Sequence, residues 1–279
     1  MARLPLELYH KIFSYLSDDH EALKACSLTC QALTSESQKY IFARIVLGLP
    51  SSRDDPRFLS PRFERFQHLC GMPGVGSATK FRQLLDKSPH IAGYVECLQI
   101  IEMESLDPKD HKTWISENYD LPHCLPHFQK LKALVVCGFR DWNWLPFGSE
   151  LVRLLNLPLI FLDLAGCLLP IPIVASMSPD IKHLSIRSYT HKKYQLPVLP
   201  NTSKSCPIRL ESLFISDVGC LRRQEFSSRL DTTRLRKLAL NRAWITCSDR
   251  NPEIWNLLET CRNTLEDFMI FSCKDGKFR

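Results

Sequence analysis

The sequence lacks the short motifs that mark most hydrolases and nucleotide-dependent enzymes. The glycines at positions 71, 74 and 76 follow no strand pattern, and no Gly-Lys-Ser/Thr phosphate loop occurs. His20-Glu21 is not followed by the second histidine of a zinc-protease helix, and there is no Gly-x-Ser-x-Gly elbow. We therefore expect a chain without catalytic residues, which acts by binding.

Cysteine is plentiful, with 12 residues, but none stands in the C-x-x-C spacing of zinc sites. The nearest group of potential ligands is His123, Cys124 and His127, which the prolines at 122 and 126 place in a loop. No second ligand pair lies nearby, so we expect neither a metal nor a cofactor.

Long apolar runs are also missing. Polar and acidic residues stand in positions 1–20, where a signal peptide would have its apolar core. The most apolar stretch, residues 154–175, is interrupted by polar residues and prolines and is predicted to be a buried strand with flanking loops. We expect no membrane partner and a cytoplasmic or nuclear location.

The net charge of +6 is unevenly distributed: residues 91–180 carry −5 and residues 181–279 carry +8. A basic last third can attract nucleic acid or an acidic protein partner. The alternative, which we favour, is a solvated charged surface, so nucleic acid is not the expected partner.

The segment with the clearest pattern is residues 1–47. Apolar residues at 4, 8, 12, 13 and 16 recur at helical spacing, and Pro5 suits a first helical turn. Asp18 with Glu21 resembles a capping box and predicts the start of a second helix, and a third is expected over residues 33–42. Three such short helices are too small to bury a core alone, so they should pack on a partner or on the rest of the chain.

This segment resembles the F-box, the adaptor-binding module of SCF-type ubiquitin ligases, and is most similar to fungal F-boxes. The resemblance rests on Leu4-Pro5-x-Glu7-Leu8, Ile12-Phe13-x-Tyr15-Leu16 and Leu23-Lys24-Ala25-Cys26-Ser27-Leu28. It departs from the family at Leu33, where a tryptophan is common. The resemblance implies that a Skp-type adaptor contacts Leu4, Pro5, Leu8, Ile12 and Leu16, supported by Leu23 and Leu28.

A short strand is expected over residues 43–47, and residues 48–77, which are rich in proline, serine, glycine and arginine, are predicted to be a linker. After them the phrase apolar-x-x-apolar-x-apolar occurs seven times, centred on residues 98, 134, 162, 184, 213, 238 and 268. This spacing resembles irregular leucine-rich repeats, in which each strand is followed by a loop or helix. Helices are expected over residues 148–157, 221–230 and 252–262.

The predicted fold is therefore α/β. A three-helix F-box (residues 1–47) precedes the linker and a leucine-rich-repeat solenoid with a curved parallel sheet (residues 78–279). Another α/β arrangement of the same strands is the alternative. No polar capping segment follows the last strand phrase, so we expect the repeat array to be short at its C-terminal end.

A substrate surface is predicted on the open face of that sheet. Side chains alternate along a strand, so the neighbours of the inward residues must face outward together. We expect Phe214, Met269 and Phe271 to be exposed there, beside basic residues, as in a protein-binding patch. The alternative is that neighbouring loops or the C-terminal tail cover them. The predicted substrate-binding residues are Asp163, Arg187, Tyr189, Phe214, Lys237, Asn241, Met269 and Phe271.

These features predict a non-catalytic substrate receptor of an SCF ubiquitin ligase. By resemblance, its partners would be the Skp-type adaptor, the cullin and RING subunits held through it, and an unknown protein substrate. Two alternatives remain: an interaction scaffold that binds the adaptor without causing degradation, and a nucleic-acid binder that uses the basic last third.

The cysteines are predicted to be reduced, because most stand among leucines and isoleucines and no secretion signal is found. Cys137, Cys167 and Cys273 each follow a strand phrase, where small apolar residues pack well. Mass spectrometry without reductant should find no native intrachain bridge. Two or more stoichiometric disulfides would contradict this prediction.

Overall fold

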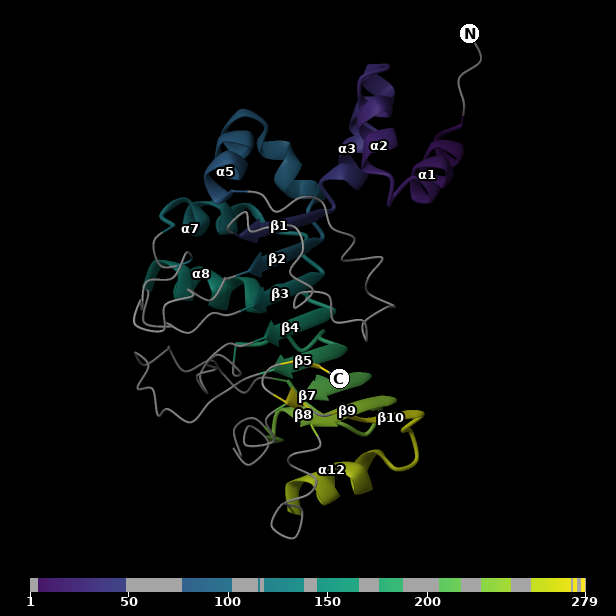
Figure 1. Cartoon of the computed structure of the whole chain (residues 1–279), viewed down its shortest axis with the longest axis vertical. Coiled ribbons are helices and arrows are strands. Elements are labelled where there is room, and N and C mark those ends of the chain that lie inside the picture. The colour runs from purple at the N-terminus through teal and green to yellow at the C-terminus, as the bar shows by residue number, and fades with distance from the viewer. Residues whose placement is uncertain are drawn as a thin grey trace.

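The structure, a computed structural model, describes residues 5–48, 77–101, 115, 118–137, 145–165, 176–187, 206–216, 227–241, 252–271, 273–274 and 277–278. Its centre is one parallel sheet of eight strands in the order β1-β2-β3-β4-β5-β7-β9-β10. The strands are stacked one above the next along the length of the molecule (Figure 1). Their bounds are β1 Arg44–Gly48, β2 Cys97–Ile101, β3 Ala133–Cys137, β4 Phe161–Ala165, β5 His183–Arg187, β7 Ser212–Ile215, β9 Lys237–Asn241 and β10 Asp267–Phe271.

The seven strand phrases all form strands, so the prediction of an α/β fold with a parallel sheet is confirmed. The eighth strand, β1, was assigned to the helical domain except for its last residue. It pairs in parallel with β2, with Arg44 opposite Cys97, so the predicted boundary after residue 47 falls inside the sheet. The helical unit itself ends at Ile41.

Helices lie at both ends of the sheet and along one side of it. The three N-terminal helices are α1 (Leu6–Tyr15), α2 (His20–Ser27) and α3 (Gln31–Ile41). Helices α5 (Ala78–Lys87), α7 (Asp120–Cys124) and α8 (Leu145–Leu155) stand on one side of strands β1 to β4, and α12 (Pro252–Cys261) lies near β10 (Figure 1). The 3-10 helices η3 (Pro89–Tyr94) and η4 (Leu125–His127) complete this layer.

Two small sheets accompany the main one: β6 (Ile208–Arg209) pairs with β8 (Leu230–Asp231), and β11 (Cys273–Lys274) pairs with β12 (Lys277–Phe278). Leu230 therefore lies in a strand, which corrects the C-terminal end of the helix predicted over residues 221–230. Most of that helix lies outside the described residues. Among the described residues, no helix is long and apolar enough to cross a membrane.

The core lies between the sheet and the helices. In each of the six strands β2 to β9 of the main sheet, the two inward residues of the phrase are at most 1% exposed, as with Leu98 and Ile100. Leu151, Leu154 and Leu155 of α8 pack in the same cluster. Apolar residues at alternate strand positions thus meet the apolar stripe of a helix, as the repeat pattern requires.

The start of each strand is fixed by a repeated hydrogen-bond pattern. The N–H groups of Lys132 and Ala133 both donate to Glu96 O, at 2.8 and 3.0 Å, and the same double contact recurs at every main-sheet strand from β2 to β10. The residues just before the strands also form charged pairs from one repeat to the next. These pairs are Lys132–Glu96 at 2.8 Å, Lys182–Glu211 at 3.0 Å and Arg236–Glu266 at 3.7 Å.

Candidate functional site

One side of helix α1 carries large apolar side chains in contact with solvent. Leu8 and Ile12 are each 44% exposed and Tyr15 is 80% exposed. Their spacing of four and three residues places them along one face of the helix. We call these three residues the α1 apolar face. It is a candidate docking surface, because an exposed apolar cluster on a small helical unit marks an interaction site.

The opposite side of α1 is held against α3. Phe13 is buried and stacks on Tyr40, with ring centroids 6.0 Å apart. The Tyr40 hydroxyl donates to the backbone oxygen of His10 at 3.3 Å. The predicted stripe of α1 therefore divides into a buried residue, Phe13, and an exposed face. Because Phe13 anchors the helix, Leu8 and Ile12 are left facing outward.

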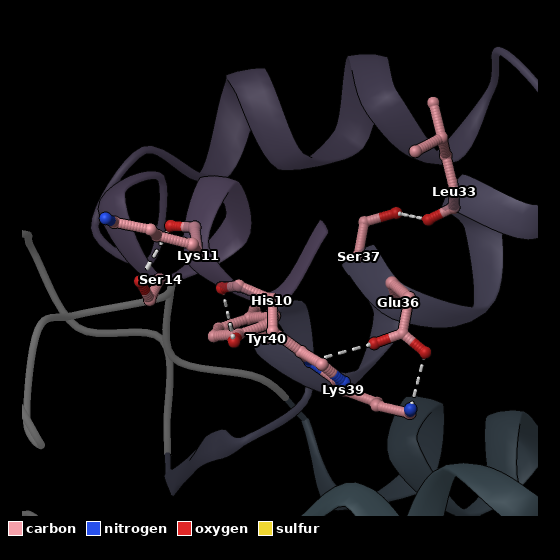
Figure 2. A network of polar contacts seen from close by, with 8 residues as sticks. All are labelled: His10, Lys11, Ser14, Leu33, Glu36, Ser37, Lys39 and Tyr40. Carbon is pink, nitrogen blue, oxygen red and sulfur yellow. Dashed lines mark hydrogen bonds and ion pairs between the residues drawn. The ribbon is translucent and has the colours of Figure 1, made fainter. Parts of the chain in front are cut away.

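A buried carboxylate strengthens this contact (Figure 2). Glu36 of α3 is only 9% exposed; its Oε1 lies 2.6 Å from Lys39 Nζ and its Oε2 lies 3.4 Å from His10 Nδ1. The second contact joins α3 to α1, although its length exceeds that of a strong hydrogen bond. Ser37, one residue on, donates to the carbonyl of Leu33, whereas Oε2 of Glu36 is buried and, among the described residues, has no hydrogen bond and only the ion-pair contact with His10.

Helix α2 begins one residue later than the predicted capping box implied. Asp19, not Asp18, is the N-cap, and its carboxylate accepts from Ala22 N at 2.9 Å. Asp18 instead lies 3.7 Å from Arg44 of β1, so it contacts the sheet. A further contact joins the same two parts, with Gln38 Oε1 3.4 Å from His90 Nε2. The helical unit thus packs on the repeat domain, one of the two expected outcomes.

The predicted adaptor-binding residues differ in their exposure. Pro5, Leu8, Ile12 and Leu28 are exposed, and Leu28 is 87% open at the end of α2. Leu16 is half-buried. Leu23 is completely buried, so it can support the surface only by holding α2 in place. Leu4 lies outside the described residues.

Tyr15 was not among the predicted contact residues, although it is the most exposed member of the α1 apolar face. Its position seven residues after Leu8 is the signal that identifies it, because two helical turns return to the same face. Tyrosine is common at interfaces, where its ring and its hydroxyl can both be used.

The second candidate surface is the face of the sheet opposite the helices, which we call the outer sheet face. As predicted, its side chains align across the strands. Strand pairing places one residue of each neighbouring strand in a single row: Gln99, Val135, Asp163, Ser185, Phe214, Ala239 and Met269.

Two contacts organise this face. Arg187 of β5 makes a two-point ion pair with Asp163 of β4: Nε lies 3.2 Å from Oδ1, and Nη2 contacts Oδ2. Beyond β5, Phe214 of β7 and Phe271 of β10 stack with ring centroids 4.5 Å apart. Ser185, between Asp163 and Phe214 in the row, is completely buried.

The expectation that this face is open is wrong for its aromatic residues. Phe214 is 5% exposed and Phe271 is 2% exposed, and their rings stack on each other. Asp163 and Asn241 are also buried, whereas Lys237, Met269 and Arg187 are half-buried. Tyr189 lies outside the described residues. Truncating either phenylalanine would therefore cost stability, about 3 kcal/mol or more.

No group of three histidine, cysteine or acidic side chains that could hold a metal occurs within the described ranges. The cluster at 123–127 does not lie in a loop, as predicted, but in α7 and η4, where prolines are tolerated in the first turns. Cys124 points into the core, with its Sγ 3.7 Å from Ala78 O, while His123 and His127 are exposed. Burial raises the pKa of the Cys124 thiol to about 12, so it is a packing residue and a poor metal ligand.

Comparison with models of protein families, with curated proteins and with solved structures gave no match.

His183, at the start of β5, makes the free energy of unfolding depend on pH. Burial lowers its pKa from 6.5, and Lys182 and Lys237 lower it further, against an opposing effect of Glu211. The unfolded chain therefore binds a proton at His183 more readily than the folded chain does. The contribution of neutral His183 to the free energy of unfolding is present above pH 6.5 and declines as the pH falls below it.

We expect the wild-type protein to lose more unfolding free energy between about pH 7.5 and about pH 5.5 than a His183→Gln variant loses. Urea titration at the two pH values measures this difference. Equal losses in the two proteins would show that His183 is not responsible.

Proposed function

We propose that this chain is the substrate-receptor subunit of an SCF-type E3 ubiquitin ligase. The F-box resemblance of residues 1–47 motivates the proposal. The observation that supports it most directly is the α1 apolar face, where Leu8, Ile12 and Tyr15 are open while Phe13 anchors the helix. A Skp-type adaptor would cover this face, with Leu28 and Pro5 beside it, and would connect the chain to the cullin and RING subunits.

In this role the chain would catalyse nothing itself. The repeat domain would hold a protein substrate, and ubiquitin transfer would be accelerated because the assembly brings the reactants together. The helical unit contacts β1 through Asp18–Arg44 and η3 through Gln38–His90. An adaptor bound to the helical unit and a substrate bound to the repeat domain would therefore be held in a defined position relative to each other.

The nucleic-acid alternative is weakened by local charge pairing. Five described basic side chains of the last third lie within 4 Å of a carboxylate: Lys182, Arg187, Arg209, Arg236 and Arg262. A phosphate backbone would have to compete with these carboxylates. Salt-sensitive binding of the full chain to nucleic acid would favour the alternative nonetheless.

Adaptor binding is tested by Ile12→Asp combined with Pro5→Ala. An aspartate at position 12 would be buried without a partner in the complex, so affinity should fall on the order of a thousandfold. In the free chain Ile12 is 44% exposed, so the substitution should leave the fold intact. Co-purification with the adaptor, together with the circular dichroism spectrum, measures both effects.

The matched control is Ile160→Asp, because Ile160 has a similar exposure of 41% but lies immediately before β4. This variant should retain the adaptor. If the double variant also retains it, the proposed F-box role fails.

Substrate binding is tested at Lys237 and Met269, which lie on the outer sheet face and are half-buried. Lys237→Glu with Met269→Lys should release the substrate while the adaptor stays bound, because the charge pattern is reversed and apolar area is lost. Affinity purification with and without a proteasome inhibitor measures this. Partners that bind equally well to the variant would place the docking surface elsewhere.

The inhibitor also separates a receptor from a scaffold. A substrate of the ligase accumulates when the proteasome is blocked, whereas a partner of a non-degradative scaffold does not change in amount.

A further inference from the structure

The two ends of the main sheet differ in how their apolar residues are covered. In β1, the inward residues are Ile45, which is half-buried, and Leu47, which is 1% exposed. In β10, at the other end, Phe268 is 43% exposed and Ile270 is 47% exposed. These two residues occupy the inward positions of the strand phrase, which are at most 1% exposed in β2 to β9 of the main sheet. The β10 end therefore presents core-type residues to solvent.

The backbone of β10 is also open on one side. Asp267 N donates to Arg236 O, so residues 267, 269 and 271 direct their backbone groups toward β9. Alternate residues of a strand point to opposite sides, so Phe268 and Ile270 direct their N–H and C=O groups away from the sheet. Among the described strands none pairs with this side, because β10 ends the sheet order. Such an edge is a template for another strand.

We propose that a second copy of this chain occupies the edge, through antiparallel pairing of β10 with its equivalent around a two-fold axis at Met269. In that register Phe268 of one copy lies opposite Ile270 of the other. An aromatic residue opposite a β-branched one is a favourable cross-strand pair. The backbone groups that face outward belong to the same two residues, so hydrogen bonding and apolar contact reinforce each other.

A second copy fits better than a head-to-tail chain of copies. Head-to-tail pairing would need β1 as the acceptor, but Val46 and Leu47 of β1 are buried, Ile45 is half-buried, and the helical unit stands beside that strand. The contact must therefore use the same strand in both copies, which closes the assembly at a dimer.

The charges around the edge permit this arrangement. The exposed residues at α12 include Trp255 and Glu259, and Glu259 lies 2.6 Å from Arg262, the residue after the helix. Asp267 is the strand partner of Lys237 of β9, so a basic residue of the same copy occupies the neighbouring position in the sheet. The two-fold axis therefore brings together no uncompensated like charges from these residues. The proposed dimer is independent of the ligase role.

The test is the mass of the full chain by light scattering over a hundredfold range of concentration. The expected result is a transition from 32.2 kDa to twice that mass. Phe268→Lys with Ile270→Lys should weaken dimerisation by about a hundredfold or more, because four cations would meet across the two-fold axis. Circular dichroism verifies that this variant remains folded, and the exposure of both side chains predicts that it will.

Ile160→Lys is the control, since Ile160 is 41% exposed yet lies on a central strand phrase, and it should leave the dimer unchanged. A wild-type chain that stays monomeric throughout would overturn the proposal. So would a dimer that survives the double substitution, one that is abolished by Ile160→Lys or Ile12→Asp, or assemblies that keep growing with concentration. A monomer that binds a strand of another protein at β10 would identify a different occupant and also overturn it.

Discussion

The structure depends on the register between neighbouring strands. Each strand of the main sheet from β2 to β10 begins where two successive N–H groups donate to the carbonyl that precedes the previous strand, as Lys132 and Ala133 do to Glu96. Parallel pairing repeats this relation without a shift, so apolar residues stay on the core side and polar ones on the other. A slip of one residue would place Leu134 and Val136 on the outer face. The alignment of Asp163 with Ser185 and Phe214 has the same origin.

Much of this arrangement could be predicted, because the strand phrase reports side-chain alternation directly. Seven strands and the alignment of Asp163, Phe214 and Met269 on one face follow from it. β1 was not assigned to the sheet, because Arg44–Gly48 follows a helix immediately and does not contain the full phrase. Asp18 and Asp19 are adjacent potential caps, and local sequence does not distinguish them; packing of Asp18 against Arg44 does.

The alternation of apolar residues along the strands does not predict how exposed a side chain is. Alternation shows which face a side chain occupies but not whether another group covers that face. Phe214 and Phe271 were therefore expected to be open, whereas they stack on each other. The same reasoning applies to α1, where helical spacing grouped Phe13 with Leu8 and Ile12. Only the contact with Tyr40 shows that Phe13 is turned inward and the others outward.

The long separation between β1 and β2 has a consequence for the entropy of the unfolded chain. Paired residues of β4 and β5 are 22 positions apart, from Phe161 to His183, whereas Arg44 and Cys97 are 53 apart. Loop-closure entropy makes the longer closure more costly by about 0.8 kcal/mol. The longest closure of the main sheet is therefore the one that joins β1, with the helical unit before it, to β2. The contact of Gln38 with His90 spans this closure and helps to offset its cost.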